Sequence, residues 1–172
     1  MRDAFGGLLN IVIIVVFMTL VSGYLAFNVS YAKAFKVKNK IISTIENYNG
    51  SCDFNNSENT CYKDVLNYEK TIGYQANVNM SQATICNKSS TEGYSDCKCN
   101  QALGFCWLES RKEVKDGIEG KTITTIHYKS FRIVTQVYID LPIINRLLPN
   151  LSIFQVTGDT KDIPMNMKTK TN

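Results

Sequence analysis

The sequence predicts an α+β protein in which a long amino-terminal helix packs on a small, mostly antiparallel β-sheet. Three features lead to this prediction. Residues 4–32 are uncharged and mostly apolar, an amphipathic extension follows them, and short segments with alternating apolar and polar side chains fill much of the second half. A change from helical to alternating periodicity along one small chain is typical of an α+β architecture.

The uncharged stretch is the strongest of these features, because it is long enough to span a lipid bilayer. About 20 mostly apolar residues in helical form cross the hydrocarbon layer, and residues 8–27 provide them without a proline. Asn10 is the one strongly polar side chain in that span, and the surrounding Leu, Ile, Val and Phe side chains outweigh the cost of its insertion. A buried helix of a soluble core is the alternative, but such helices are seldom uncharged over this length. We therefore expect residues 1–32 to form a leader and a transmembrane helix in contact with the bilayer.

Residues 33–49 continue the helical pattern beyond the predicted membrane span, so one helix over residues 4–47 is expected. Asn47, Asn49 and Gly50 supply the stop signal. The apolar side chains that recur at three- and four-residue spacings are expected to pack against protein: Tyr31, Ala34, Phe35, Ile41, Ile42, Ile45 and Tyr48. Three lysines fall on another side, where a solvated face is favoured over pairing with acids of a neighbouring protein: Lys33, Lys36 and Lys40.

The remainder predicts one small domain, residues 50–160, followed by a mobile tail, residues 161–172. A short helix is expected over residues 62–71, with a narrow apolar edge of Tyr62, Val65 and Leu66, ended by Gly73. The expected strands cover residues 76–80, 103–108 with a solvated continuation to 115, 121–128, 131–140 and 152–158. A turn at 116–120 joins two of them, residues 87–101 have the composition of a loop, and residues 141–151 form an apolar connection that contains two prolines.

All six cysteines lie in the predicted domain, and we expect two or three disulfides formed in an oxidising compartment: Cys52, Cys61, Cys86, Cys97, Cys99 and Cys106. Cys52 paired with Cys61 is favoured because it closes a short local loop, and the other pairings stay open. One alternative is a zinc site made by the last four cysteines, although their spacing matches no common zinc motif. Reduced thiols are the other alternative.

Two signals disagree about which side of the membrane the domain occupies. Four lysines follow the span, and the positive-inside rule would place them in the cytoplasm: Lys33, Lys36, Lys38 and Lys40. The cysteines favour an oxidising space outside, and long domains translocate largely regardless of charge. We therefore expect a single-pass membrane protein with an extracytoplasmic carboxy-terminal domain. Cleavage of a secretory signal near Ala32-Lys33-Ala34 is the alternative, but the apolar region is longer than a signal core.

Both ends of the chain carry a recognisable order of features. Met1-Arg2-Asp3-Ala4-Phe5-Gly6-Gly7 reads as a short leader with small residues before the anchor, and RIVTQVYIDLPIINRLLPNLSIFQVTGD gives a strand, a proline-containing apolar connection and a final strand. This order resembles the TadE-like pseudopilins of tight-adherence (Flp-type, type IV-like) pilus systems. The resemblance implies leader processing near Gly6 and Gly7. In that family a glutamate early in the mature chain pairs with the amino terminus of the next subunit, whereas Asn10 lies near that place here. A minor or accessory subunit therefore fits better than a major pilin, and such a subunit can remain uncleaved.

The resemblance implies a structural or assembly subunit of a tight-adherence pilus or a related secretion apparatus, with other pilin-like subunits or pilus assembly proteins as partners. Gly23 and Ala26 allow close approach of neighbouring helices, and Asn10 can hydrogen-bond across such a contact. The alternative is a single-pass membrane-anchored extracellular binding module unrelated to pili. A third possibility is a membrane regulator that faces the cytoplasm with free thiols.

Several function classes are not expected. Nucleophilic catalysis needs a base beside the nucleophile, and the single histidine, His127, lies in a Thr/Ile-rich segment where a sheet position is expected. The chain has no phosphate-binding glycine loop and no H-E-x-x-H motif. Its net charge of +4 comes from scattered lysines, which disfavours nucleic-acid binding. We expect no enzyme, no cofactor, no small-molecule substrate and no catalytic or metal-binding residue.

Overall fold

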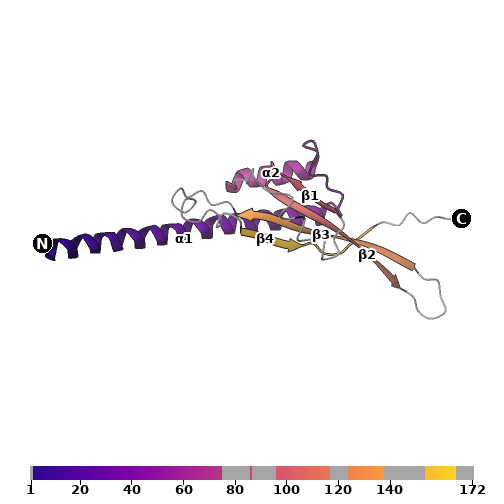
Figure 1. Cartoon of the computed structure of the whole chain (residues 1–172). Helices are drawn as coiled ribbons and strands as arrows, with labels where there is room; N and C mark the ends of the chain where they lie inside the picture. The colour runs from indigo at the N-terminus through magenta and orange to yellow at the C-terminus, as the bar shows by residue number, and fades with distance from the viewer. Residues whose placement is uncertain (1, 75–85, 87–95, 117–123, 138–153, 166–172) are drawn as a thin grey trace.

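The computed structural model describes residues 2–74, 86, 96–116, 124–137 and 154–165, and it confirms the α+β prediction. A long helix, α1 (Arg2–Asn47), runs from the amino terminus, and a shorter helix, α2 (Thr60–Ile72), packs on its second half. The strands are β1 (Asp96–Asn100), β2 (Phe105–Asp116), β3 (Thr124–Val137), β4 (Phe154–Asp159) and β5 (Ile163–Pro164). Figure 1 shows the first half of α1 projecting away from the protein and the second half lying against α2 and the sheet.

The helix α1 is unbroken over 46 residues, as the uncharged stretch and its amphipathic extension predict. Asn49 and Gly50 end it, because both adopt the left-handed backbone conformation, with φ of 49° and 67°. The Gly50 amide donates a hydrogen bond to the Ile45 carbonyl at 2.8 Å, which satisfies one of the last helical acceptors.

The packing face of α1 differs in part from the predicted stripe. Ala34, Ile41 and Ile45 are buried as expected, and Val37 is buried as well. Three predicted members remain substantially exposed: Tyr31, Phe35 and Tyr48. They lie beside the buried stripe. The apolar side chains of this segment cover a wider arc of the helix than the part that contacts the core.

The helix α2 begins and ends close to its predicted bounds. The Asn59 side chain accepts a hydrogen bond from the Cys61 amide at 2.9 Å, and Gly73 adopts the left-handed conformation that closes the helix. Its buried face consists of Cys61, Val65 and Glu69, at four-residue spacing. Of the predicted apolar edge, Val65 is buried. The other two members, Tyr62 and Leu66, are partly buried and pack against the core.

The sheet is antiparallel throughout the described strands, with the order β1-β2-β3-β4 and with β5 also pairing with β3. One face covers the two helices through alternate side chains of β2 and β3, among them Phe105, Trp107 and Ile133. Phe54, in the segment between the helices, inserts its ring there, with centroids 5.1 Å from Phe105 and 5.6 Å from Trp107. The main core therefore lies between α1, α2 and one face of the sheet.

The second half of α1 lies directly on β3 and β4. The Thr135 hydroxyl lies 3.3 Å from the Ala34 carbonyl and donates to it. Gly158 of β4 lies under α1, where a Cβ atom would stand 2.9 Å from Lys38 Cδ and 3.0 Å from Ile42 Cδ1. A glycine at this position allows the strand and the helix to approach closely.

Two predictions about the strands are wrong. Residues 96–100, predicted as loop, form β1, because their pairing with residues 105–109 of β2 overrides their polar composition. The two strands predicted over 121–128 and 131–140 are one strand in the described range, since β3 continues through Lys129 and Ser130 opposite Arg111 and Ser110.

Part of the segment predicted as a mobile tail, residues 161–165, belongs to the described structure. Thr160 is buried and exchanges hydrogen bonds with Phe131, and Ile163 is 6% exposed in the short strand β5. The predictions for residues 76–80, 117–120, 141–151 and 166–172 lie outside the described residues.

Candidate functional site

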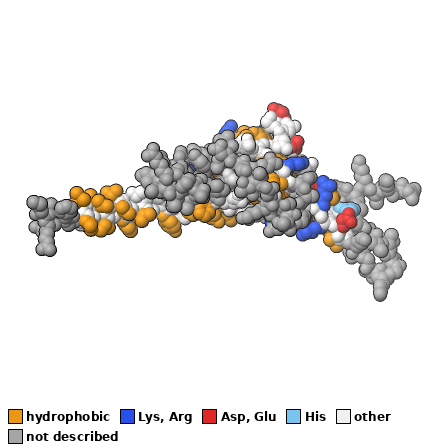
Figure 2. Space-filling model, in the orientation of Figure 1, with side chains coloured by type: hydrophobic (Ala, Val, Ile, Leu, Met, Phe, Trp, Pro, Cys, Tyr) orange, Lys and Arg blue, Asp and Glu red, His pale blue; other side chains and the backbone are white. Residues whose placement is uncertain are grey.

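The exposed half of α1 is the most unusual surface of the described chain. In the most apolar stretch of α1, only 6% is buried. Among the described residues, α1 is the one helix that is long and apolar enough to cross a membrane. Leu8, Ile11 and Phe17 are each more than 60% exposed. Figure 2 shows hydrophobic side chains along the projecting part of the helix. An apolar surface of this length needs lipid or another protein to cover it.

Two hydroxyl groups in this half have hydrogen-bond partners that suit an apolar environment. The hydroxyls of Thr19 and Ser22 each donate to the backbone carbonyl four residues earlier, at 2.8 Å. Such bonds keep a hydroxyl satisfied without water. Asn10 is exposed on the apolar surface, where its amide can meet a neighbouring helix or the polar edge of the bilayer.

The residues predicted for helix packing and leader processing do not share one environment. Gly23 is buried and Ala26 is half-buried, close to the level at which the sheet domain begins, whereas Asn10 is exposed. Gly6 and Gly7 lie within α1, and nothing lies within 4 Å of a Cβ placed on Gly7. Gly7 and Asn10 are therefore open to a partner, whereas Gly23 is buried.

An aromatic group marks the level at which the exposed helix meets the domain. The ring of Phe27 contacts Phe154 of β4 edge-on, with centroids 5.1 Å apart, and stacks near Tyr31 at 6.2 Å. Tyr24, one turn earlier, is 67% exposed. Aromatic side chains of this kind are enriched where a protein crosses the membrane surface.

The lysines that follow are less solvated than predicted. The Lys33 ammonium donates to the Gly73 carbonyl at the end of α2, at 3.0 Å, and Lys40 lies over the Tyr68 ring, 6.0 Å from its centroid. Lys38 is buried, with its ammonium 4.1 Å from the Phe35 ring centroid. Lys36 is exposed, as a solvated face requires. The amphipathic extension therefore uses several of its lysines for contacts within the chain.

A buried acid lies on the face of α2 that meets the core. Glu69 is 4% exposed, and its Oε1 atom has no hydrogen-bond partner within the described residues. Burial raises the pKa of Glu69 from 4.5 to about 8, so the carboxyl is mostly protonated at neutral pH.

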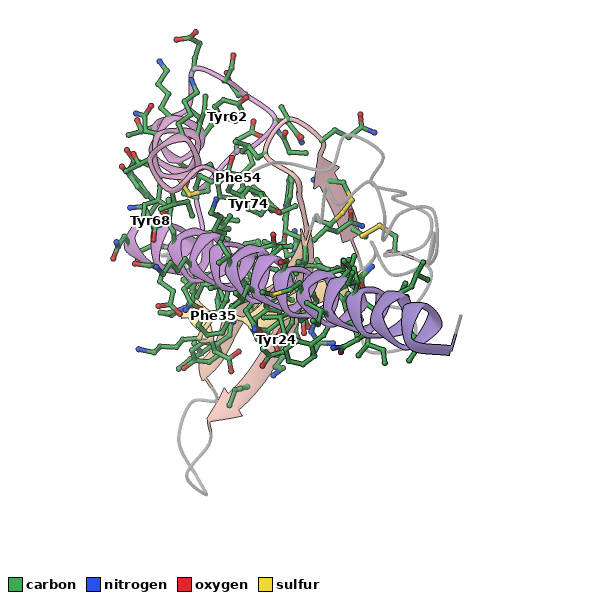
Figure 3. All side chains as sticks on the ribbon, turned by 90° about the vertical axis from the view of Figure 1, so that its left-hand side faces the viewer. Tyr24, Phe35, Phe54, Tyr62, Tyr68 and Tyr74 are labelled. Carbon is green, nitrogen blue, oxygen red and sulfur yellow. A yellow bond between two sulfur atoms is a disulfide. The ribbon has the colours of Figure 1, made fainter. Side chains whose placement is uncertain are left out.

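Tyr74 lies close to this acid and bridges two parts of the sheet. Its hydroxyl donates to the Gln136 carbonyl at 2.8 Å and lies 3.3 Å from the Gly104 carbonyl. Burial, together with the Glu69 charge, raises the pKa of Tyr74. Figure 3 shows Tyr74 and Phe54 between α2, α1 and the sheet, with Tyr24 and Phe35 on the other side of α1. Glu69 and Tyr74 are thus part of the packing between α2 and the sheet.

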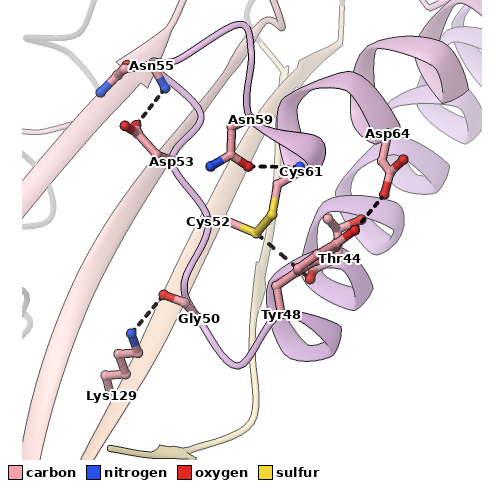
Figure 4. The surroundings of a disulfide bond; sticks show 10 residues. All are labelled: Thr44, Tyr48, Gly50, Cys52, Asp53, Asn55, Asn59, Cys61, Asp64 and Lys129. Atoms are coloured by element: carbon pink, nitrogen blue, oxygen red, sulfur yellow. Dashed lines mark hydrogen bonds between the residues drawn. A yellow bond between two sulfur atoms is a disulfide. The ribbon is translucent and has the colours of Figure 1, made fainter.

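All six cysteines are paired in three disulfides, and no cysteine is free. Cys52 bonds to Cys61, the pairing that the sequence favoured, and fastens the segment after α1 to the first turn of α2 (Figure 4). Lys129 secures the same segment by donating to the Gly50 carbonyl at 2.7 Å. The reduced-thiol and zinc alternatives do not describe this oxidised chain.

The other two disulfides gather at the β1 end of the sheet. Cys86 bonds to Cys97, and Cys99 bonds across the strands to Cys106, its register partner. Together with Leu108 and Val134, Cys106 lies on the sheet face that points away from the helices. These bonds fasten the edge strand β1, which had been predicted as a loop in need of such links.

His127 lies in β3, in agreement with the sheet position predicted for it. Its Nδ1 atom is 3.3 Å from Glu113 Oε1 on the paired strand β2. Both side chains are partly exposed, which gives a surface pair of modest strength.

No family model, curated protein or solved structure matches this chain. The features that bear on its function are the exposed helix, the domain packed on it and the disulfides.

The sequence reasoning missed Glu69, Tyr74 and the contact between Phe27 and Phe154. Glu69 could have been found, because it follows Cys61 and Val65 at successive four-residue steps on one helix face. The aromatic contact joins residues far apart in the chain, so no local pattern announces it.

Proposed function

We propose that this protein is a membrane-anchored, pseudopilin-like structural or assembly subunit of a tight-adherence pilus or a related secretion apparatus. The observation that carries the proposal is the continuity of α1. One helix presents a bare apolar surface over its first half and supplies core side chains to the sheet domain over its second half. Anchor and displayed domain are therefore joined without a linker.

This continuity suits a subunit that works by packing. Val37, Ile41 and Ile45 of α1 are each at most 1% exposed in the core, so α1 cannot rotate without disrupting the domain. A neighbouring helix that packs on the exposed half would consequently fix the orientation of the sheet domain as well.

Two further features support an extracytoplasmic domain on a single-pass anchor. Three disulfides in a small domain are typical of an oxidising compartment. The aromatic side chains around Phe27 and Tyr31 lie where the helix would leave the bilayer, about 20 residues after Leu8.

The resemblance to TadE-like pseudopilins supplies the finer part of the proposal, with an accessory role favoured by Asn10 in place of the early glutamate. In this role the exposed amide of Asn10 hydrogen-bonds to a partner helix within the membrane, where small residues such as Gly7 permit close approach.

Co-purification from membranes tests the proposal. We expect the full-length protein to be found in the membrane fraction and to bring pilin-like or pilus assembly proteins with it. Asn10→Leu should keep the protein in the membrane but reduce its partners severalfold, whereas Ile14→Lys should weaken both insertion and association. Lys63→Ala, a change on the exposed face of α2, is the matched control. Undiminished partner recovery with both Asn10→Leu and Gly7→Leu would contradict a helix-packing subunit.

A binding module anchored by the same helix is distinguished by a shortened chain. A fragment that begins near Phe27 retains the α1 side chains of the core, whereas one that begins at Gly50 lacks them and is not expected to fold. The pilus proposal predicts that the longer fragment loses association with the assembly. A specific ligand bound at full strength by that fragment would favour the binding module instead.

A further inference from the structure

Among the described residues, the densest gathering of metal-binding side chains lies at the β1–β2 end of the sheet. The Sγ atoms of Cys86, Cys97 and Cys99 all lie within 4.8 Å of one another. The Cys106 Sγ atom is bonded to that of Cys99, at 1.98 Å. Four sulfur atoms therefore occupy one small volume.

The backbone determines this gathering for three of the four cysteines. Cys97 and Cys99 are alternate residues of β1, so they point to the same sheet face. Cys106 of β2 lies directly opposite Cys99 in the antiparallel register, with a Cα–Cα distance of 4.0 Å. Two alternate residues of one strand and a cross-strand neighbour form a triangle, and Cys86 approaches it with its Cα 5.6 Å from that of Cys97.

The spacing suits a tetrahedral thiolate site once the two disulfides are reduced. Zn²⁺ binds cysteine sulfur at about 2.3 Å in tetrahedral geometry, which separates neighbouring ligand sulfurs by about 3.8 Å. The Sγ atoms of Cys86, Cys97 and Cys99 lie within 4.8 Å of one another, and the Cys106 Sγ atom is bonded to that of Cys99, so the four sulfurs already lie near this spacing. Reduction lets each bonded pair of sulfurs relax to ordinary contact, so small side-chain rotations can bring the set to tetrahedral spacing.

The surroundings also suit a structural metal site. Cys106 is fully buried and the other three are half-buried, beside the apolar side chains of Leu108 and Val134. Structural zinc sites fill all four coordination positions with protein ligands, and these four cysteines can supply them.

We propose that the reduced form of this chain binds one Zn²⁺ through Cys86, Cys97, Cys99 and Cys106, and that oxidation to the two disulfides releases the ion. Each disulfide takes two electrons from a dithiol reductant, which becomes a disulfide itself, and gives two thiols. Binding of Zn²⁺ by the four thiols then displaces their protons as the thiolates form. Oxidation by a disulfide-carrying oxidant reverses the sequence. The site would hold β1 on the sheet before the disulfides form, whatever partners the mature protein has.

The test uses the full-length chain in detergent, reduced with a dithiol and then freed of it without oxygen. Co²⁺ is the spectroscopic probe, because a tetrahedral cobalt–thiolate site absorbs strongly where aqueous Co²⁺ does not. We expect one Co²⁺ per chain, displacement by Zn²⁺, and protection of four of the six thiols from alkylation in the zinc-loaded protein. Reoxidation should release the zinc to a chromophoric chelator.

The third disulfide provides the matched control. Cys52→Ser/Cys61→Ser removes a cysteine pair from the helix side of the core and should bind Co²⁺ as the original chain does. Cys97→Ser/Cys99→Ser should lose the tetrahedral spectrum, with at least a hundredfold weaker binding. If this variant fails to fold, Cys86→Ser, outside the strand ladder, should weaken binding at least tenfold. Absence of a tetrahedral spectrum in the original reduced chain, or its retention in both site variants, would overturn the proposal.

Discussion

Replacement of Glu69 by glutamine should abolish most of the pH dependence of folding stability near neutrality. The carboxyl of Glu69 is 4% exposed, and burial raises its pKa from 4.5 to about 8. Below pH 4.5 the carboxyl is neutral in both the folded and the unfolded chain. As the pH rises towards 8, the unfolded chain loses this proton first, so the unfolded state binds fewer protons and the folded state loses stability.

The magnitude follows from the two pKa values. Between them, the unfolding equilibrium constant rises by at most a factor of ten for each pH unit, so the free energy of unfolding falls by at most about 5 kcal/mol. Local opening that admits water to the carboxylate lowers this limit, and we expect a loss of about 2 to 4 kcal/mol between pH 5 and pH 8. Glu69→Gln carries a neutral amide of similar shape at every pH, so its stability should stay nearly flat over the same range.

Urea unfolding of the disulfide-intact protein in detergent measures this difference. Trp107, the single tryptophan, is buried in the core beside Phe54 and Phe105, so its fluorescence reports loss of packing. Glu58→Gln is the control, because that side chain is 83% exposed and its loss should leave the pH dependence unchanged. Parallel pH profiles of the original protein and Glu69→Gln would refute the reasoning.

Three other substitutions test the packing around the helices by the same unfolding measurement. Phe54→Ala empties an aromatic cluster and should cost about 3 to 5 kcal/mol; a cost below 1 kcal/mol would contradict its central place in the core. Asn59→Ala removes the amino-terminal cap of α2 and should cost about 1 kcal/mol, while Asn67→Ala, on the exposed face of the same helix, should cost little. Gly50→Ala forces a Cβ into a left-handed position 2.5 Å from Lys129 Cε and should cost about 1 to 3 kcal/mol; equal stability would show that Lys129 moves aside freely.

The helical part of the fold could be predicted because its signals are local. Absence of charge over residues 4–32 sets the long helix, and the stop at Asn49 and Gly50 reflects backbone conformations that these two residue types tolerate. Gly73 ends α2 for the same reason. The alternation of Phe131 and Ile133 likewise identifies the face of β3 that covers the helices.

The remaining features depend on contacts between distant residues. The polar segment Asp96–Asn100 becomes a strand only because β2 offers it a complete antiparallel register. The two-residue strand Ile163–Pro164 is specified by Tyr128 and Lys129 on β3, and no composition rule detects a strand so short. Proximity of Cys97, Cys99 and Cys106 follows from the same register, which explains why the pairing of these cysteines could not be chosen from spacing alone.

Because α1 runs without a break from its exposed half into the domain core, a movement of the first half is transmitted to the whole domain. Transmembrane helices tilt by about 20° on average, and such a tilt displaces a point about 30 Å farther along the helix by about 10 Å. Since no hinge interrupts α1 between Arg2 and Asn47, changes in bilayer thickness or in a neighbouring helix would reorient the whole sheet domain. A small change in the tilt of the helix within the membrane would therefore produce a larger displacement of the domain surface.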